Sequence, residues 1–130
     1  MARHWRFGIR DREVYSGCER VMAAVAANID NSPVPHDSGW HATLLRRMHN
    51  DFPGVRERVL SDETYRALDA IRAFRHRERN SYGMSLDADI VEERVREAVE
   101  AFEMFRLDIK RLALTLDPSA MDELEKRPKD

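Results

Sequence analysis

Apolar residues recur at helical spacing along most of this 130-residue chain, and no segment alternates them with period two. Repeats of three and four residues line one face of a helix, whereas a strand requires alternation. The glycines and prolines, five of each, cluster between the periodic segments and so mark the connections. The pattern predicts an all-α fold without a sheet, namely an antiparallel four-helix bundle.

The predicted helices cover roughly residues 10–30, 40–51, 61–82 and 88–116. Ser61 and Asp87 have the side chains that N-cap positions favour, and Asp62 and Glu63 suit the dipole of a first helical turn. Residues 1–116 are expected to form one domain, and residues 117–130 a polar tail. The first predicted helix is expected to bury its apolar face, formed by Val14, Cys18, Val21, Val25 and Ile29. The fourth is expected to bury Val95, Val99, Phe102, Phe105, Ile109, Leu112 and Leu116.

The composition limits what the chain can bind. Hydrophobic residues make up 42% and charged residues 35%, and the net charge is -2. That is enough apolar material for one core, and it gives no general attraction to nucleic acid, so a basic site must be local. All but three of the 22 basic residues are Arg, which favours bidentate binding of phosphate or carboxylate.

The cysteine count and the apolar runs bear on the compartment. Cys18 is the single cysteine, which excludes an internal disulfide and a cysteine zinc cluster, and it lies on the apolar face of the first helix. The longest apolar run, residues 21–27, is far shorter than the roughly 20 residues of a membrane span. We therefore expect a cytoplasmic protein with no membrane segment.

One segment departs from the core pattern. Residues 72–79 hold four Arg against one Glu, and residues 75–81 contain no aliphatic side chain. On a helix, Arg72, Arg75, Arg79 and Tyr82 form one ridge, with His76 and Asn80 on an adjacent face. Such a ridge could hold a phosphodiester and handle protons. The alternative is a solvated helix end, because Arg suits a helix C-terminus and Gly83 is an ordinary stop.

The segment FRHRERNSYG at 74–83, followed by Leu86 and Asp87, resembles the HepT-like toxins of the HEPN superfamily. These carry Arg, four residues, His, one residue and Tyr near the end of a bundle helix. Arg75, Asn80 and Tyr82 occupy those three positions. GWHATLL at 39–45, PGVR at 53–56 and AFEMFR at 101–106 are similar to the branch with a Phe-Arg-His signature. The resemblance covers roughly residues 11–116.

The resemblance implies a HEPN-type four-helix bundle that forms a homodimer. It also implies a metal-independent endoribonuclease, the toxin of a type II toxin–antitoxin pair, with RNA in a cleft between protomers. The expected antitoxin is a nucleotidyltransferase that can transfer AMP to Tyr82. Arg75 would contact the scissile phosphate, Asn80 and Tyr82 would complete the site, and Arg72 and Arg79 would bind RNA.

The family histidine is replaced here by Asn80. An amide can orient a hydroxyl or bind phosphate, but it is no general base near neutral pH. His76 lies one turn earlier on nearly the same face, and it could supply the imidazole. Two functions therefore stay open: an active ribonuclease, or a catalytically inactive HEPN-type module that binds a nucleotidyltransferase.

The remaining histidines do not form a metal motif. His41 and His49 are eight residues apart, rather than the four that place two ligands on one helical face. His41, next to Trp40, is expected to cap or brace the second helix. The sequence also lacks a phosphate loop and a dinucleotide-binding glycine motif, so no metal or cofactor is expected.

Overall fold

The structure, a computed structural model, describes residues 3–79 and 88–119, with side chains described over residues 13–75, 89–90 and 92–119. The described chain forms α1 (Arg3–Ala24), a π-helical turn η1 (Val25–Ile29), α2 (Trp40–His49), α3 (Asp62–Arg79) and α4 (Ala88–Leu116). In these residues there is no strand, only an isolated backbone bridge between Phe52 and Arg56. The predicted all-α four-helix fold is confirmed.

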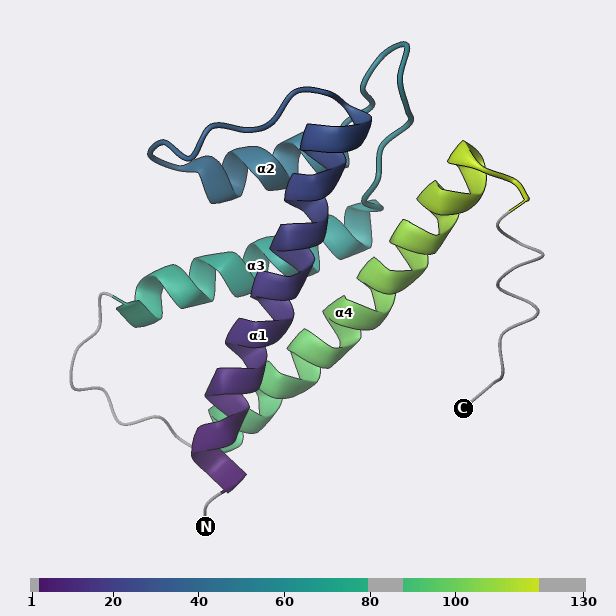
Figure 1. The fold of residues 1–130 in the computed structure, drawn as a ribbon. Helices are drawn as coiled ribbons and strands as arrows, with labels where there is room; N and C mark the ends of the chain where they lie inside the picture. Colours follow the sequence, from purple (N-terminus) through teal and green to yellow (C-terminus); the bar gives the residue numbers. More distant parts are fainter. Residues whose placement is uncertain (1–2, 80–87, 120–130) are drawn as a thin grey trace.

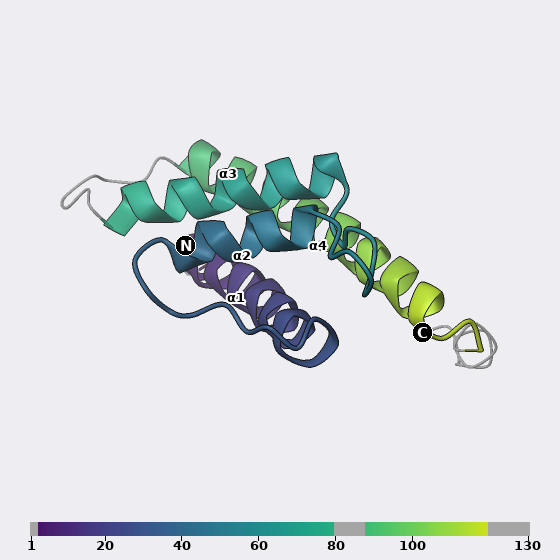
Figure 2. The same ribbon diagram turned by 90° about the horizontal axis from the view of Figure 1, so that it is seen from above.

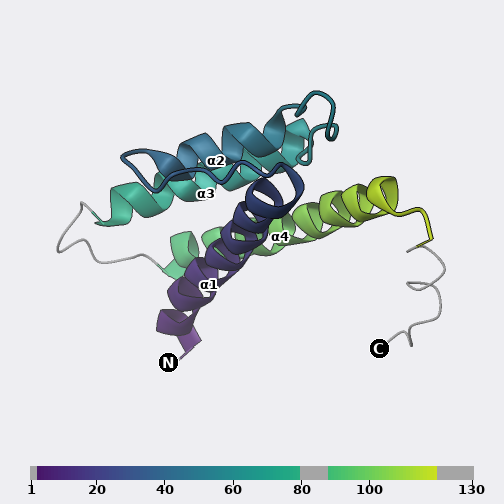
Figure 3. The ribbon, with the colours of Figure 1, turned by 45° about the horizontal axis from the view of Figure 1, so that its top comes forward.

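The helices pack in two pairs. α2 and α3 lie side by side and run in opposite directions, and this pair lies across α1 and α4 (Figures 1 and 2). Figure 3 shows the connection after α1 running along α2 back to its start. The start of α2 therefore lies beside the end of α3, a juxtaposition that brings together residues far apart in the sequence.

The helix boundaries differ from prediction mainly in α1. This helix begins at Arg3, whereas the sequence predicts a start at Arg10. Residues 3–9 carry neither an N-cap signal nor an apolar stripe, so the start could not be recognised. α4 covers Ala88–Leu116 as predicted. The predicted cap at Asp87 lies outside the described residues, as do all but three residues of the polar tail.

The core forms where the four helices meet, and it corrects part of the predicted stripes. Its buried members are Tyr15, Cys18, Met22, Val25, Ala26, Leu44, Leu45, Met48, Val59, Leu60, Leu68, Ile71, Ala98, Ala101, Phe105 and Leu112. The predicted core residue Val21 is exposed while its neighbour Met22 is buried, so α1 turns a slightly different face inward. Val99, Phe102 and Leu116 of α4 are also exposed, so the described helices leave this side of α4 partly uncovered.

A buried ion pair fixes the end of η1. Asp30 follows the π-helical turn, and its amide donates to the carbonyl of Val25 at 3.0 Å. Its carboxylate accepts two hydrogen bonds from Arg56, each 2.7 Å long, and both side chains are buried. Arg56 also donates to the backbone carbonyls of Asn50 and Glu57. The loop before α3 is thereby held against the end of the first helix.

Ser61 caps α3 as predicted. Its hydroxyl accepts a hydrogen bond from the amide of Thr64 at 3.3 Å. Its own amide donates to the carboxylate of Asp108, a buried residue of α4, at 3.0 Å. This contact sets the start of α3 against α4. None of the described helices combines the length and low charge that crossing a membrane requires.

Candidate functional site

A pocket of about 320 Å³ lies where the start of α2 meets the end of α3 over the middle of α1. It is lined by Tyr15, Ser38, Gly39, His41, Ala42, Arg72 and Arg75. The described lining residues thus include two arginines and a histidine but no carboxylate. In a chain with net charge -2, this is a local basic site of the size that ligand pockets have.

Arg75 is the predicted phosphate ligand, and it lines this pocket. Its guanidinium carbon lies 5.0 Å from the centre of the Tyr15 ring. Within the described residues it forms no hydrogen bond or ion pair, and the side chain is partly exposed. Stacking on a ring orients a guanidinium while its N–H groups stay available for an anion.

Arg72 also lines the pocket, but it is less free than predicted. Its guanidinium forms an ion pair at 2.9 Å with Asp69, three residues earlier on α3. The pair is partly exposed, so a polyanion can compete with Asp69 for the guanidinium. Arg72 therefore suits a supporting contact with an anion, and Arg75 suits the central one.

Tyr15 forms the floor of the pocket. Its side chain is buried, and its hydroxyl has no hydrogen-bond partner within the described residues. Burial, and to a lesser extent the charge of Glu19, raise the pKa of Tyr15, so the phenol stays protonated at neutral pH. A neutral hydroxyl without a partner is a spare hydrogen-bond donor.

His41 reaches the pocket from the first turn of α2. Its Nδ1 lies 2.5 Å from Oε2 of Glu19 on α1, so the ring braces α2 against α1, in line with the predicted bracing role. The backbone turns into α2 at Gly39, whose φ is 78°, a value that glycine adopts without strain. Histidine and arginine side chains from two helices thus share one pocket.

The other predicted site residues lie on the last turn of α3, which ends at Arg79, or beyond it. His76 and Arg79 lie on the last turn of α3, but their side chains are outside the described residues. Asn80 and Tyr82 lie outside them altogether. Within the described part of the chain, no group of three or more His, Cys, Asp or Glu side chains is placed to hold a metal ion.

Comparison with models of protein families matches residues 12–116 to the HepT-like proteins. The chain belongs to the HepT-like family. The match covers α2 and α3 in full and thus the whole Arg75 pocket, and it agrees with the HEPN-type bundle of the structure. No curated protein and no solved structure matches the chain.

In this HepT-like chain, the sequence did not predict Tyr15, which lines the pocket, or Glu19, which contacts the pocket residue His41, as functional residues. Tyr15 and Glu19 lie about 60 residues before Arg75, and their spacing in α1 matches an ordinary helix face. His41 offered one signal, since its neighbours Gly39 and Trp40 belong to the segment that resembles the family. A long-range pairing of Glu19 with His41 leaves no mark in the sequence.

Proposed function

We propose that this HepT-like protein is the toxin of a type II toxin–antitoxin pair and a metal-independent endoribonuclease of the cytoplasm. Its substrate is RNA, bound at a cleft between two protomers. Arg75 contacts the scissile phosphate. Asn80 takes the place of the family histidine with assistance from His76, and Tyr82 shapes the site.

The observation that carries the proposal is the guanidinium of Arg75, which has no ion-pair partner among the described residues. It lies in a pocket whose described lining residues include no carboxylate. A phosphodiester is the anion that such a site suits, because a planar guanidinium binds two phosphate oxygens at once. In the transition state, charge builds up on those oxygens, and a fixed cation lowers the barrier. Arg72 and Arg79 extend the cationic path along the RNA backbone.

An apolar groove supports the proposed homodimer. It lies between α1 and α4, has a volume of about 370 Å³ and is lined by Glu13, Val14, Gly17, Val95, Ala98, Val99 and Phe102. Val99 is 54% exposed, although it belongs to the stripe predicted to be buried. A second protomer packed on this groove would remove its apolar surface from water.

The proposed antitoxin is a nucleotidyltransferase that transfers AMP to Tyr82. A phosphate attached there would add negative charge next to the cations of α3. It would compete with RNA for the same arginines, which gives a direct means of neutralisation.

The replacement of the family histidine by Asn80 favours a second candidate. Without a general base the chain would be an inactive helical module that binds the nucleotidyltransferase. The test is cleavage of a mixed-sequence oligoribonucleotide by the purified protein. Fragments with 2′,3′-cyclic phosphate and 5′-hydroxyl ends are expected, and the matched oligodeoxyribonucleotide is expected to stay intact. Intact RNA at high protein concentration would favour the inactive module.

A further inference from the structure

The imidazole ring of His41 is held by a carboxylate on one side and by an aromatic ring on its face. The carboxylate of Glu19, whose side chain is only 14% exposed, lies 2.5 Å from Nδ1, and the His41 side chain itself is 39% exposed. A carboxylate at Nδ1 fixes the proton there and leaves Nε2 with its lone pair. Within the described residues, Nε2 has no partner. This nitrogen is therefore free to accept a hydrogen bond.

Neighbouring rings restrict the orientation of His41. Its ring lies 3.9 Å from the ring of Trp40 at an angle of 30°, and Trp40 in turn stacks on His36 at 3.8 Å. Together with the bond to Glu19, these contacts hold the imidazole at the mouth of the Arg75 pocket. Such prior orientation is what a proton-transfer group requires.

His49, on the same helix, provides a contrast. Its Nε2 lies 2.7 Å from Asp62, and its ring stacks on Tyr65 at 4.2 Å. Asp62 is exposed and also pairs with Arg58. His49 does not line the Arg75 pocket. Its contacts instead join α2 to α3 at the surface. Two histidines of one helix, each with a carboxylate, thus differ in what they face.

We propose that His41 is a catalytic residue that accepts the proton of the attacking 2′-hydroxyl, and that Glu19 positions its ring. This inference rests on the proposed ribonuclease function. It supplies the imidazole that the motif lost at Asn80, from a different helix. Among the described residues, the charged and titratable groups around His41 are Glu19 and Tyr15 on α1 and Arg72 and Arg75 on α3, with His36 beyond Trp40.

The step balances without a metal or redox partner. The 2′-oxygen forms a bond to phosphorus as His41 takes the hydroxyl proton. The bond from phosphorus to the 5′-oxygen breaks, and water supplies the proton of the new 5′-hydroxyl. The products are a 2′,3′-cyclic phosphate and a 5′-hydroxyl end, and His41 returns its proton to solvent. Arg75 holds the phosphate oxygens throughout.

The experiment measures single-turnover cleavage of a labelled oligoribonucleotide across the neutral pH range. The proteins are wild type, His41→Gln, Glu19→Gln, His76→Gln and the matched control His49→Gln. Binding is measured in parallel with a 2′-deoxy version that cannot be cleaved. Loss of a general base slows cleavage by roughly 10²- to 10⁴-fold, so His41→Gln is expected to lose that much while binding is retained.

The pH profile separates a chemical role from a structural one. Wild-type cleavage is expected to rise with pH as the imidazole loses its proton, because the base must be neutral. His41→Gln is expected to lack this rise and His49→Gln to retain it, while Glu19→Gln is expected to cleave more slowly because its imidazole is no longer held in place. Wild-type rate and profile in His41→Gln, or loss of the rise in His76→Gln alone, would overturn the role of His41.

Three outcomes can be told apart. A His41→Gln protein that loses its helical circular dichroism would show that His41 supports the fold, which overturns the proposal. Absence of cleavage by wild type would contradict the proposed function itself and with it this inference. Cleavage by wild type with an unaffected His41→Gln would overturn the inference alone.

Discussion

Arg75 at the end of α3 stacks over Tyr15 in the middle of α1, with 5.0 Å between the guanidinium carbon and the ring centre. This contact orients the cation without consuming its hydrogen-bond donors. A salt bridge would have neutralised the charge, as Asp69 does for Arg72. The aromatic support therefore leaves Arg75 as the cation best suited to an incoming phosphate.

The buried pair of Asp30 and Arg56 is expected to dominate local stability. Asp30→Asn leaves the Arg56 charge buried without its counter-ion, so the free energy of unfolding should fall by about 3–5 kcal/mol. The control is Glu103→Gln, which removes an exposed pair with Arg106 and should change it by less than ~1 kcal/mol. Urea unfolding followed by circular dichroism measures both. Equal losses of unfolding free energy in the two variants would contradict a dominant role for the buried pair.

The fold was largely predictable because burial imposes helical spacing on the sequence. Cys18 and Val25 of α1 and Phe105 and Leu112 of α4 are buried as the pattern indicated, and the cap at Ser61 followed from its residue type. The face of α1 was partly wrong, since Val21 and Met22 fit a helical stripe almost equally well. Which of them turns inward depends on how α4 packs, and that is not local information.

The site was predictable only where one segment carries it. Arg75 stood out because residues 72–79 hold four arginines at the place where the apolar stripe ends. Its partners come from other helices, so the ring of Tyr15 and the pair of Glu19 with His41 emerge only once the chain is folded. The Asp30–Arg56 pair, 26 residues apart, was missed for the same reason.

Cys18 is expected to resist modification in the folded protein. Burial raises the pKa of its thiol to about 12, and the thiolate is the reactive form. At about pH 8 the folded protein should react with a thiol reagent only as fast as it unfolds, whereas protein in guanidinium chloride should react at once. Labelling followed by mass spectrometry checks this. Rapid labelling of the native protein would contradict the burial of Cys18.

The groove between α1 and α4 is expected to form the dimer contact. Val99→Asp places a charge in it and should yield monomers, because burying an unpaired carboxylate is costly. Val55→Asp is the control: Val55 is 43% exposed but lies on the loop before α3. Light scattering of each protein gives the mass. A dimer that survives Val99→Asp would place the contact elsewhere. A monomeric wild type would exclude the dimer.

Tyr82 is expected to be the target of AMP transfer. Co-expression with the proposed nucleotidyltransferase antitoxin should add AMP-sized increments to the intact mass of the wild type and none to Tyr82→Phe. Tyr65→Phe is the control, since Tyr65 packs beneath the His49 ring and should leave the increments unchanged. Increments on Tyr82→Phe, or none on the wild type, would refute the modification site.

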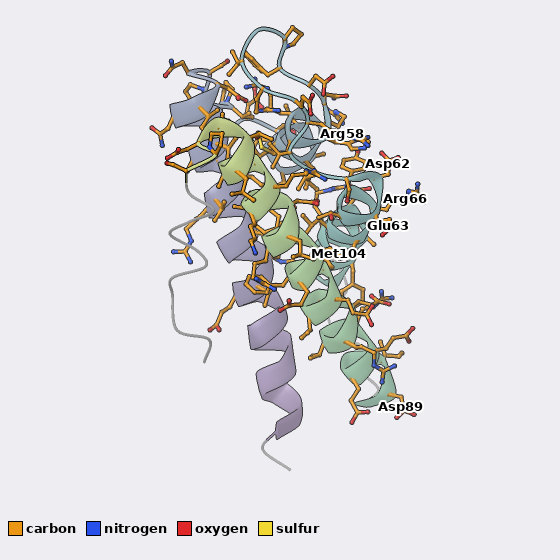
Figure 4. All side chains as sticks on the ribbon, turned by 90° about the vertical axis from the view of Figure 1, so that its right-hand side faces the viewer. Arg58, Asp62, Glu63, Arg66, Asp89 and Met104 are labelled. Carbon is orange, nitrogen blue, oxygen red and sulfur yellow. The ribbon has the colours of Figure 1, made fainter. Side chains whose placement is uncertain are left out.

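The most direct measurement of the central claim is the RNA cleavage rate of Arg75→Ala. Its matched control is Arg66→Ala, an exposed arginine on the opposite part of α3 near Asp62 and Glu63 (Figure 4). Arg75→Ala should abolish cleavage, while the lost contact with Tyr15 lowers stability by only about 0.5–1 kcal/mol. Arg66→Ala should cleave as the wild type does. Undiminished cleavage by Arg75→Ala, or its unfolding under conditions where Arg66→Ala stays folded, would contradict a phosphate-binding role for Arg75.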